Sequence, residues 1–511
     1  MTAERCVLAI DIGTQSSRAA LVDFSGNILA SAAQAYDLES PAPGWAQQDA
    51  RLWWQSSVAN IRRVFEKSGI SPGSVAAVAA GSQMHAAIPI DFSGEVLVPA
   101  VQLWCDKRCA GFVAELGKRT EIQEAFSLVG NVPTAAWLGL KIMWLQANRP
   151  DVYHKTWKVL TAGAYITYQL TGGFPVIDYS EASGSFLMDA KRRTWSSHMF
   201  DLLGLDAEKL PLLLPSSQVA GKVSRQAAQT TGLLEGTPVA VGAGDMLCTL
   251  LAAGLTQTGR AVDITGTSSI ICIYTNQPVL DQRLMNLHHC MPGWITFGIS
   301  DSGGGSLKWF KDAFCQEEKE IAALSGGSPY RLLDEQAEQV EPGAEGLLFY
   351  PYLLGERTLG SPYSRGVFFG LSPRSSKGAL ARAIMEGVSF EMLRSLEIAR
   401  QSGMQVDQIR LVGGGAQSPL WCQIKANIYQ LPVAVLKTFE GGTLGAAILA
   451  GVAGGVFPDE ASVADQVVQI DHVLFPDPGQ ADLYQRMYEV YKQLHDRMID
   501  PFERLAQITA K

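Results

Sequence analysis

The feature that most constrains the fold is a pattern that occurs twice, about half a chain apart. From Ala9 the sequence reads AIDIGTQSSRAAL, and from Ala261 it reads AVDITGTSSIICI. Each copy has a β-branched run, an aspartate, a Gly-Thr pair with serines close behind and a second apolar run. This order predicts two strands joined by a tight turn. We therefore expect an α/β fold with two similar halves that face each other.

Other segments carry the mixture of strands and helices that an α/β fold requires. The segments VAAVAAGSQ (from Val75) and PVAVGAGD (from Pro238) predict strands of small residues. The segments ARLWWQSSVANIRRVFEKSG and GALARAIMEGVSFEMLRSLEIARQSG have helical spacing and end in glycine. The tail from Asp471 is polar and predicts a helix. We expect the domain boundary near residue 245, which gives domains of residues 1–245 and 246–511.

Composition restricts the partners of this chain. Hydrophobic residues make up 47% and charged residues 18%, so a sizeable core is expected. The formal net charge is -9. This charge argues against nucleic acid as a partner, because a phosphate backbone binds a basic surface. A single phosphorylated ligand remains compatible, since backbone amides can hold it.

No segment predicts secretion or membrane insertion. The opening apolar run, CVLAI, ends at Asp11 and is short for a signal peptide. The apolar stretch LGAAILAGVAGGVF from Leu444 is too short to cross a bilayer and predicts a packed core helix. The eight cysteines have no disulfide-framework spacing, which is typical of reduced thiols. We therefore expect a cytoplasmic protein without a membrane partner.

Four turns rich in glycine or threonine, each at an expected strand end, favour a nucleotide or phosphate ligand. They are IGTQSS after Asp11, ITGTSS after Asp263, SDSGGGSLKW from Ser300 and LVGGGAQSPLW from Leu411. In the last, a strand and a glycine turn lead to Ser418 as a helix N-cap, and such a helix start favours phosphate. The standard motifs GxxxxGK[ST] and GxGxxG are absent, and an ordinary strand-to-helix connection remains the alternative.

Asp245 follows an expected strand and a Gly-Ala-Gly turn. One interpretation is a helix cap. The functional interpretation is a general base in a cleft between the halves, because a sugar hydroxyl is a poor nucleophile until a carboxylate accepts its proton. On this hypothesis Asp11 meets Mg²⁺, through water. Thr14, Gln15 and Ser16 would then face the phosphates.

These residues resemble the FGGY carbohydrate kinases, within the actin, hexokinase and heat-shock ATPase superfamily. The matching stretches include DIGTQSSRA, GSQMHAAIPID, LWCDKR, VGAGD, DITGTSS, RGVFFGL and LVGGGAQSPLWCQ, in the family's order over nearly the whole chain. The resemblance implies two ribonuclease-H-like domains with a central cleft, the first binding sugar and the second nucleotide. It also implies an ATP·Mg²⁺ site between them, with Asp245 as catalytic base, and it leaves a homodimer open.

The expected cofactor contacts lie in the four turns. The predicted metal ligand is Asp11. The predicted nucleotide-binding residues are Gly13, Thr14, Gln15, Ser16, Gly266, Thr267, Gly305, Gly414, Gly415, Ala416 and Ser418.

The resemblance also points to a sugar. Met84 and His85 resemble the Met-His pair that lies against the ketose in xylulokinases, and Trp104, Asp106 and Arg108 stand where the family lines its sugar pocket. Asp106 would accept hydroxyl hydrogen bonds, and Trp104 would cover an apolar sugar face. The predicted substrate site consists of Met84, His85, Trp104, Asp106 and Asp245. The expected reaction converts D-xylulose and ATP to D-xylulose 5-phosphate.

Two departures keep other acceptors open. Xylulokinases usually carry asparagine after the catalytic aspartate, where this chain has Met246, and the glycine after Met-His is Ala86. Gluconate kinases of the family also lack that glycine, so gluconate or another pentulose or polyol is the alternative acceptor. A non-catalytic, actin-like ATP-binding interaction protein is an alternative of a different class. A serine hydrolase at Ser302 is a third, although a GxSxG motif on a strand is absent.

Overall fold

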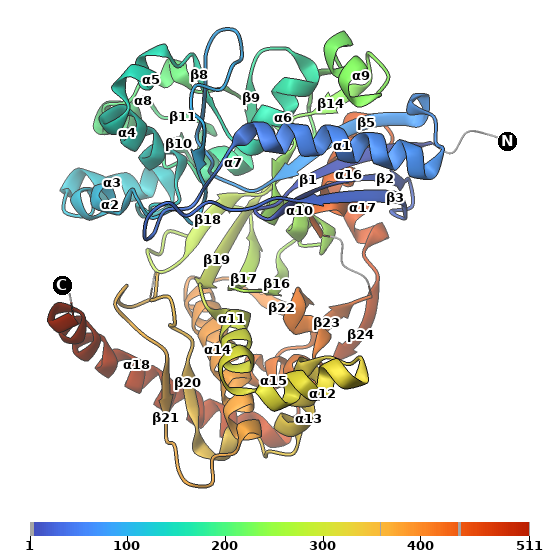
Figure 1. Ribbon diagram of the computed structural model, residues 1–511. Coiled ribbons are helices and arrows are strands. Elements are labelled where there is room, and N and C mark those ends of the chain that lie inside the picture. The colour runs from blue at the N-terminus through green and yellow to red at the C-terminus, as the bar shows by residue number, and fades with distance from the viewer. Residues whose placement is uncertain (1–4, 358, 438–440, 510–511) are drawn as a thin grey trace.

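The computed structural model describes residues 5–357, 359–437 and 441–509. It has two lobes, one formed mainly by the N-terminal half of the chain and one by the C-terminal half (Figure 1). We call them the first and the second lobe. Each is built around a sheet for which seven strands are described.

The first-lobe sheet combines antiparallel and parallel strand pairs. Its order is β13 (Val219–Lys222), β14 (Pro238–Ala240), β5 (Val75–Ser82), β1 (Cys6–Ile12), β2 (Ser16–Asp23) and β3 (Ile28–Ala35), and β15 (Ala243–Gly244) also pairs with β5. Strands β1, β2 and β3 are antiparallel, whereas β5 runs parallel to both β1 and β14.

The second-lobe sheet repeats this arrangement. Its order is β18 (Met285–His288), β19 (Trp294–Ser300), β17 (Ser269–Thr275), β16 (Gly259–Thr265), β22 (Val406–Val412), β23 (Val433–Leu436) and β24 (Ile470–Leu474). Strands β16, β17 and β19 are antiparallel, and β22 runs parallel to β16 and β23. The repeated sequence pattern therefore marks the same hairpin, β1–β2 and β16–β17, in two matching sheets.

Helices pack against both sheets, and small strand pairs extend the first lobe. Helix α1 packs on β2 and β3, and α6 packs on β5. The first-lobe helices are α1 (Ala50–Ser68), α2 (Ala110–Leu116), α3 (Thr120–Val129), α4 (Leu138–Asn148), α5 (Pro150–Lys155), α6 (Ala162–Thr171), α7 (Tyr179–Ser183), α8 (Ser197–Leu203), α9 (Arg225–Thr231) and α10 (Asp245–Ala252). The strand pairs are β4 (Gln47–Gln48) with β7 (Val101–Gln102), β6 (Ile88–Ile90) with β8 (Lys158–Leu160), β9 (Val176–Asp178) with β12 (Leu212–Leu214), and β10 (Met188–Asp189) with β11 (Thr194–Trp195).

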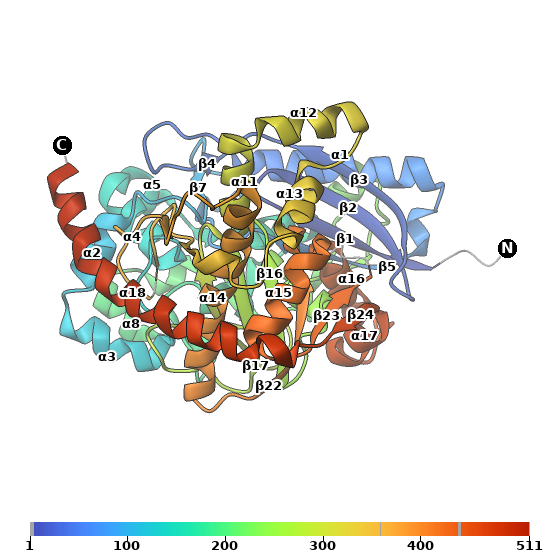
Figure 2. The ribbon, with the colours of Figure 1, turned by 90° about the horizontal axis from the view of Figure 1, so that it is seen from below.

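Long helices form much of the second lobe. They are α11 (Gly303–Phe314), α12 (Gln316–Ser325), α13 (Pro329–Glu338), α14 (Lys377–Gln401), α15 (Pro419–Tyr429) and α18 (Ala481–Thr509), with the strand pair β20 (Leu348–Tyr350) and β21 (Val367–Phe369). Figure 2 shows α18 crossing the second lobe next to α14 and α15. The predicted helical tail needs one correction, because residues 470–474 pair with β23 as strand β24 before α18 begins.

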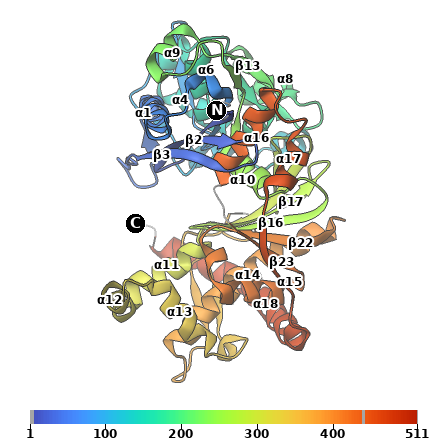
Figure 3. The ribbon, with the colours of Figure 1, turned by 90° about the vertical axis from the view of Figure 1, so that its right-hand side faces the viewer.

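Two helices from late in the chain pack on the first lobe. Helix α16 (Gly441–Ala453) contacts β1, β5 and α10, and α17 (Glu460–Val467) contacts α16 and α10. Figure 3 shows both beside the first-lobe sheet. The apolar stretch from Leu444 is thus a packed core helix, as predicted. The expected boundary at residue 245 remains a prediction, and the core of the first lobe includes residues from beyond it.

Candidate active site between the two lobes

Two cavities lie at the ends of the matching hairpins. The first, which we call the cleft cavity, has a volume of about 420 Å³ and is lined by both lobes. The second, which we call the glycine cavity, has a volume of about 630 Å³ and is lined by second-lobe residues. Ser268 lines the cleft cavity and its neighbour Thr267 lines the glycine cavity, so the turn of hairpin β16–β17 borders both.

Asp245 lies in the cleft cavity at the first position of α10. The N-cap of this helix is Gly244, so Asp245 is not the cap that the alternative interpretation required. Its Oδ1 accepts a hydrogen bond from the Met246 amide at 2.7 Å. Burial, followed by the charge of Asp11, raises the pKa of Asp245 to about 7. A carboxylate with a pKa near neutrality is suited to accept a proton from an alcohol.

Asp11 lines the same cavity from the end of β1. Burial raises its pKa to about 6, although Arg18 opposes the shift. A Cβ atom added at Gly442 would lie 2.6 Å from the Asp11 Oδ2 atom, so the start of α16 passes close to this carboxylate. The charge of Asp11 contributes to the raised pKa of Asp245, and a cation beside these two carboxylates would stabilise their charged forms.

The donor set fits a hydrated divalent ion. Within the described residues, no group of three or more His, Cys, Asp or Glu side chains could hold a metal alone. Mg²⁺ keeps several waters and is usually bound by one or two carboxylates together with substrate phosphates. Asp11 and Asp245 supply that number of carboxylates.

The first-lobe hairpin turn is tied to the cleft wall. Thr14 and Trp104 both line the cleft cavity, and the Trp104 indole donates to Thr14 Oγ1 at 3.0 Å. The Thr14 carbonyl accepts from the side chain of Gln48 at 2.7 Å. Gly13 also lines the cleft cavity, whereas Gln15 and Ser16 are exposed and line neither cavity. Contacts of Thr14, Gln15 and Ser16 with phosphate remain predictions.

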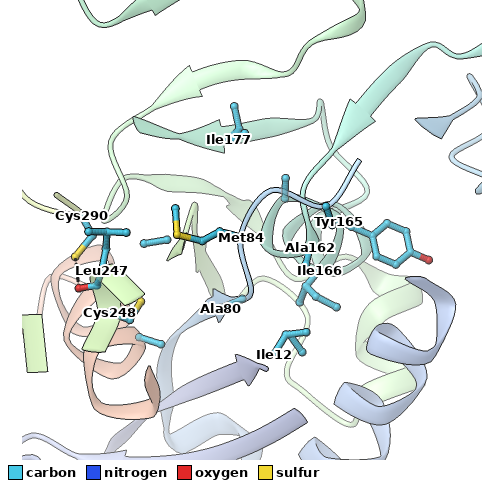
Figure 4. Close-up of a cluster of buried hydrophobic side chains, with 14 of the residues drawn as sticks. Ile12, Ala80, Met84, Ala162, Tyr165, Ile166, Ile177, Leu247, Cys248 and Cys290 are labelled. Atoms are coloured by element: carbon cyan, nitrogen blue, oxygen red, sulfur yellow. Dashed lines mark hydrogen bonds between the residues drawn. The ribbon is translucent and has the colours of Figure 1, made fainter. Parts of the chain in front are cut away.

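Met84 reaches the cleft cavity from a largely buried position. Figure 4 shows its thioether in an apolar cluster with Ala80, Leu247 and Cys248. The side chain is 6% exposed, and a Cβ at Gly244 would lie 2.6 Å from its sulfur. Met84 therefore packs against the residue that precedes Asp245 and presents only an edge to a ligand.

His85 also lines the cleft cavity, whereas Asp106 does not. Asp106 is 1% exposed, and its Oδ2 accepts from the Ala46 amide at 2.7 Å and pairs with Arg108 at 2.7 Å. Both contacts hold the segment that carries Trp104 in place. The sugar contact predicted for Asp106 has no support from this geometry, because its carboxylate is occupied and enclosed.

Most of the residues predicted to bind the nucleotide line the glycine cavity. Gly266, Thr267, Gly305, Gly414, Gly415 and Ser418 line it, whereas Ala416 does not. The Gly305 amide donates to the Thr267 carbonyl at 2.9 Å, which joins the start of α11 to the hairpin turn. A Cβ at Gly304 would clash with the Gly266 carbonyl. Gly413 has φ 85° and lies against the Thr265 carbonyl, so glycine is required where these backbones meet.

The helix that follows the last glycine turn matches the sequence prediction. Ser418 is the N-cap of α15, its side chain accepts from the Trp421 amide, and Pro419 opens the helix. Ser302, the nucleophile of the hydrolase alternative, is 3% exposed and its hydroxyl accepts from the Leu354 amide. That contact makes it part of a loop anchor.

Asp263, the counterpart of Asp11, has a different environment. It is fully buried, and its carboxylate pairs with Lys425 at 2.7 Å and accepts from the Tyr429 hydroxyl at 2.6 Å. Lys425 also donates to Thr265 Oγ1 at 2.6 Å. The second aspartate therefore anchors its hairpin on α15, whereas the first faces the cleft.

Three charged residues at the site were not singled out from the sequence. Arg357 lines the cleft cavity and pairs with Asp301 at 2.6 Å. Lys141 and Glu181 lie behind His85 and contact its backbone. Lys141 stands in the apolar run LGLKIMWL, and a charge in such a run signals a specific partner.

Comparisons with known proteins agree with this geometry. The family description "FGGY family of carbohydrate kinases" matches its N-terminal domain over residues 6–252 and its C-terminal domain over residues 261–454. A xylulose kinase of Bacillus subtilis is 28% identical, over 97% of both chains. An autoinducer-2 kinase of Salmonella paratyphi A is 31% identical, over 96% of this chain and 94% of its own.

Solved structures agree as well. The xylulose kinase from Rhodospirillum rubrum superposes with a TM-score of 0.88 at 29% identity, over 98% of this chain and 100% of its own. The two matching sheets, with a cavity between the lobes and a glycine-lined cavity beside it in the second lobe, define a two-domain sugar phosphotransferase. The chain belongs to the FGGY family of carbohydrate kinases.

In the part of the chain that the structure describes, every helix is either too short or too polar to cross a bilayer.

Proposed function

We propose that this chain transfers the γ-phosphoryl group of ATP to the terminal hydroxyl of D-xylulose, with Mg²⁺ as the metal ion. The observation that carries the proposal is the position of Asp245. It shares the cleft cavity with Asp11, Thr14 and His85, and the turn of hairpin β16–β17 borders both that cavity and the glycine cavity. An acceptor beside Asp245 and a triphosphate reaching from the glycine turns would meet at this junction.

The proposed step balances without any further reactant. The acceptor oxygen bonds to the γ-phosphorus, the bond from that phosphorus to the β–γ bridging oxygen breaks, and ADP leaves. The hydroxyl proton goes to the Asp245 carboxylate. Mg²⁺ held at Asp11 would offset phosphate charge. Residues 1–245 supply most acceptor contacts and residues 246–511 supply most nucleotide contacts, as the domain assignment proposes.

D-xylulose is the first choice because relatives named xylulose kinase span nearly the full chain. The autoinducer-2 kinase relative is about equally similar, so overall identity does not select the acceptor. The residues proposed to contact the sugar are Met84, His85, Trp104 and Asp245.

Gluconate is the second candidate, and Arg357 favours it. This guanidinium lines the cleft cavity and could pair with the carboxylate of an aldonic acid. Its ion pair with Asp301 already balances part of its charge. Met246 also lines the cavity in place of a polar side chain and removes one expected hydroxyl contact.

A coupled ADP-release screen tests both proposals. The purified protein is given ATP and Mg²⁺ with D-xylulose, D-ribulose, L-xylulose, hexuloses, xylitol, glycerol or D-gluconate, and NMR locates the phosphate in any product. We expect the highest kcat/KM with D-xylulose and phosphorylation at its terminal hydroxyl. A preference for gluconate would replace the acceptor, and no acceleration by any acceptor would refute the reaction class.

A further inference from the structure

His85 has an unusual backbone conformation. Its φ is 67°, in the left-handed region that side chains with a Cβ rarely adopt. The residue lines the cleft cavity, where a ligand-contacting imidazole is expected. Such a conformation persists only where the surroundings hold it in place.

Two buried ionisable side chains hold this backbone from both sides. The Lys141 ammonium on α4 donates to the His85 carbonyl at 2.7 Å. The His85 amide donates to Glu181 Oε2 on α7 at 3.2 Å. Lys141 is 0% exposed and Glu181 is 3% exposed. Burial raises the pKa of Glu181 well above its ordinary value, and its carboxyl can accept from the His85 amide in either protonation state. Polar groups are costly to bury unless they are hydrogen-bonded, so the contacts with His85 help to offset the burial of both side chains.

The imidazole ring is enclosed on its other sides. It packs edge-on against Trp137, with ring centroids 5.0 Å apart, and a Cβ at Gly184 would clash with its Cε1 atom. Its Nδ1 is buried and has no hydrogen-bond partner among the described residues. Because a Cβ at Gly184 would also lie 2.9 Å from Nδ1, this nitrogen packs against Gly184, and Nε2 is the nitrogen left to meet a ligand in the cavity.

We propose that Lys141 and Glu181 are positioning residues, which hold His85 in its left-handed conformation so that Nε2 faces the acceptor sugar. The inference rests on the proposed function, since it gives His85 a role in binding the acceptor. Burial, with the charges of Lys141 and Arg357, keeps the pKa of His85 well below its ordinary value. The ring is thus neutral and binds a hydroxyl without competing with Asp245 for its proton.

Replacing the lysine tests the proposal against a matched control. Lys141→Met removes the donor to the His85 carbonyl. Lys158 is another largely buried first-lobe lysine, 8% exposed, and donates to the Leu210 carbonyl at 2.8 Å, outside the cleft lining. We expect Lys141→Met to raise the KM for D-xylulose about tenfold or more, because the variant loses a hydrogen bond from a charged donor. The KM for ATP should be unchanged. Lys158→Met should leave both KM values unchanged.

A double variant separates positioning from general loss of stability. In a His85→Ala background the lysine has no ring left to position, so Lys141→Met should change the KM for D-xylulose by less than about twofold. An equal effect of Lys141→Met in both backgrounds would overturn the proposal.

The glutamate tests the same proposal from the other side and serves if Lys141→Met does not fold. Glu181→Gln keeps an oxygen that can accept from the His85 amide, so the KM for D-xylulose should stay near the wild-type value. Glu181→Leu removes that acceptor and should raise it. Equal KM values for these two variants would contradict a positioning role.

Crystal structures give a readout that does not depend on the choice of sugar. In Lys141→Met or Glu181→Leu, residue 85 is expected to leave the left-handed region or to turn its ring from the cavity, whereas Lys158→Met should keep φ near 67°. Unchanged geometry at His85 in both variants would overturn the inference. Failure of the wild-type protein to use D-xylulose would instead count against the proposed acceptor.

Discussion

The substitution Asp245→Asn should make the protein more stable while it removes activity. Burial beside Asp11 raises the pKa of Asp245 from its ordinary value of 3.8 to about 7. The folded state therefore binds this proton more tightly than the unfolded state does. The free energy of unfolding of the wild-type protein therefore falls as the pH rises from about 4 to about 7. Above pH 7 this contribution no longer changes, because the carboxylate is ionised in both states. Asparagine has no such dependence.

The size of the effect follows from the same pKa values. Each pH unit between 3.8 and about 7 lowers the free energy of unfolding by about 1.4 kcal/mol. The gain in that free energy on Asp245→Asn therefore has an upper limit of about 4 kcal/mol. Asp245 keeps partial solvent contact, so we expect about half of this, or about 2 kcal/mol, at pH 7.5. At pH 4.5 the gain should be below about 1 kcal/mol. Loss of the general base should lower kcat by a factor of about 10² to 10⁴.

Urea unfolding at pH 4.5 and 7.5 measures the difference, with Asp201→Asn on the exposed end of α8 as control. Asp201→Asn should leave the free energy of unfolding unchanged at both pH values. The reasoning would be refuted if Asp245→Asn gave no gain at pH 7.5, or the same gain at pH 4.5. Near-normal kcat in Asp245→Asn would refute the assignment of the base.

Three further predictions concern the same site. The pH profile of kcat/KM for the acceptor should rise through about pH 7 as Asp245 of the free enzyme ionises, and a profile that falls there would contradict a carboxylate base. Lys425→Met leaves the Asp263 charge buried without its partner, so urea unfolding should show a loss of about 3–5 kcal/mol, and unchanged stability would contradict the anchor. Asp334 lines the glycine cavity, and its Oδ1 is buried without a partner among the described residues. Asp334→Ala should therefore raise the KM for ATP about fivefold and leave the sugar KM unchanged, whereas an unaltered KM for ATP would mean that this carboxylate does not contact the nucleotide.

Local sequence patterns predicted the repeated architecture because the two hairpins are local structures. Asp11 and Asp263 stand at equivalent places in matching sheets, and the glycine turns lie at strand ends as expected. Helix α15 begins at the predicted cap, Ser418. Turn chemistry and apolar spacing specify these features within a few residues of chain.

Features that depend on distant residues were not predictable in this way. The partner of Asp263 is Lys425, on a helix much later in the chain, and no local pattern shows that one aspartate is neutralised and the other is not. Asp106 stands in a stretch shared with the family, yet Arg108 and the Ala46 amide enclose its carboxylate. Contacts across the fold decide which of several polar residues reaches the ligand.

Helix α16 is a similar case. Its apolar composition predicted burial, but not that it would pack on the first-lobe sheet and bring Gly442 against Asp11. Lys141, by contrast, carried a usable signal. A charged residue within an apolar run needs a specific partner, and the lysine in α4 stands in such a run.

The most direct test of the central claim is a crystal structure of the protein with D-xylulose, Mg²⁺ and a non-hydrolysable ATP analogue. The account predicts the terminal sugar hydroxyl within about 3.2 Å of an Asp245 carboxylate oxygen. It also predicts the triphosphate against Gly266, Thr267 and Gly414, with its γ-phosphate directed at that hydroxyl. A sugar bound away from Asp245, or a nucleotide outside the glycine cavity, would contradict it.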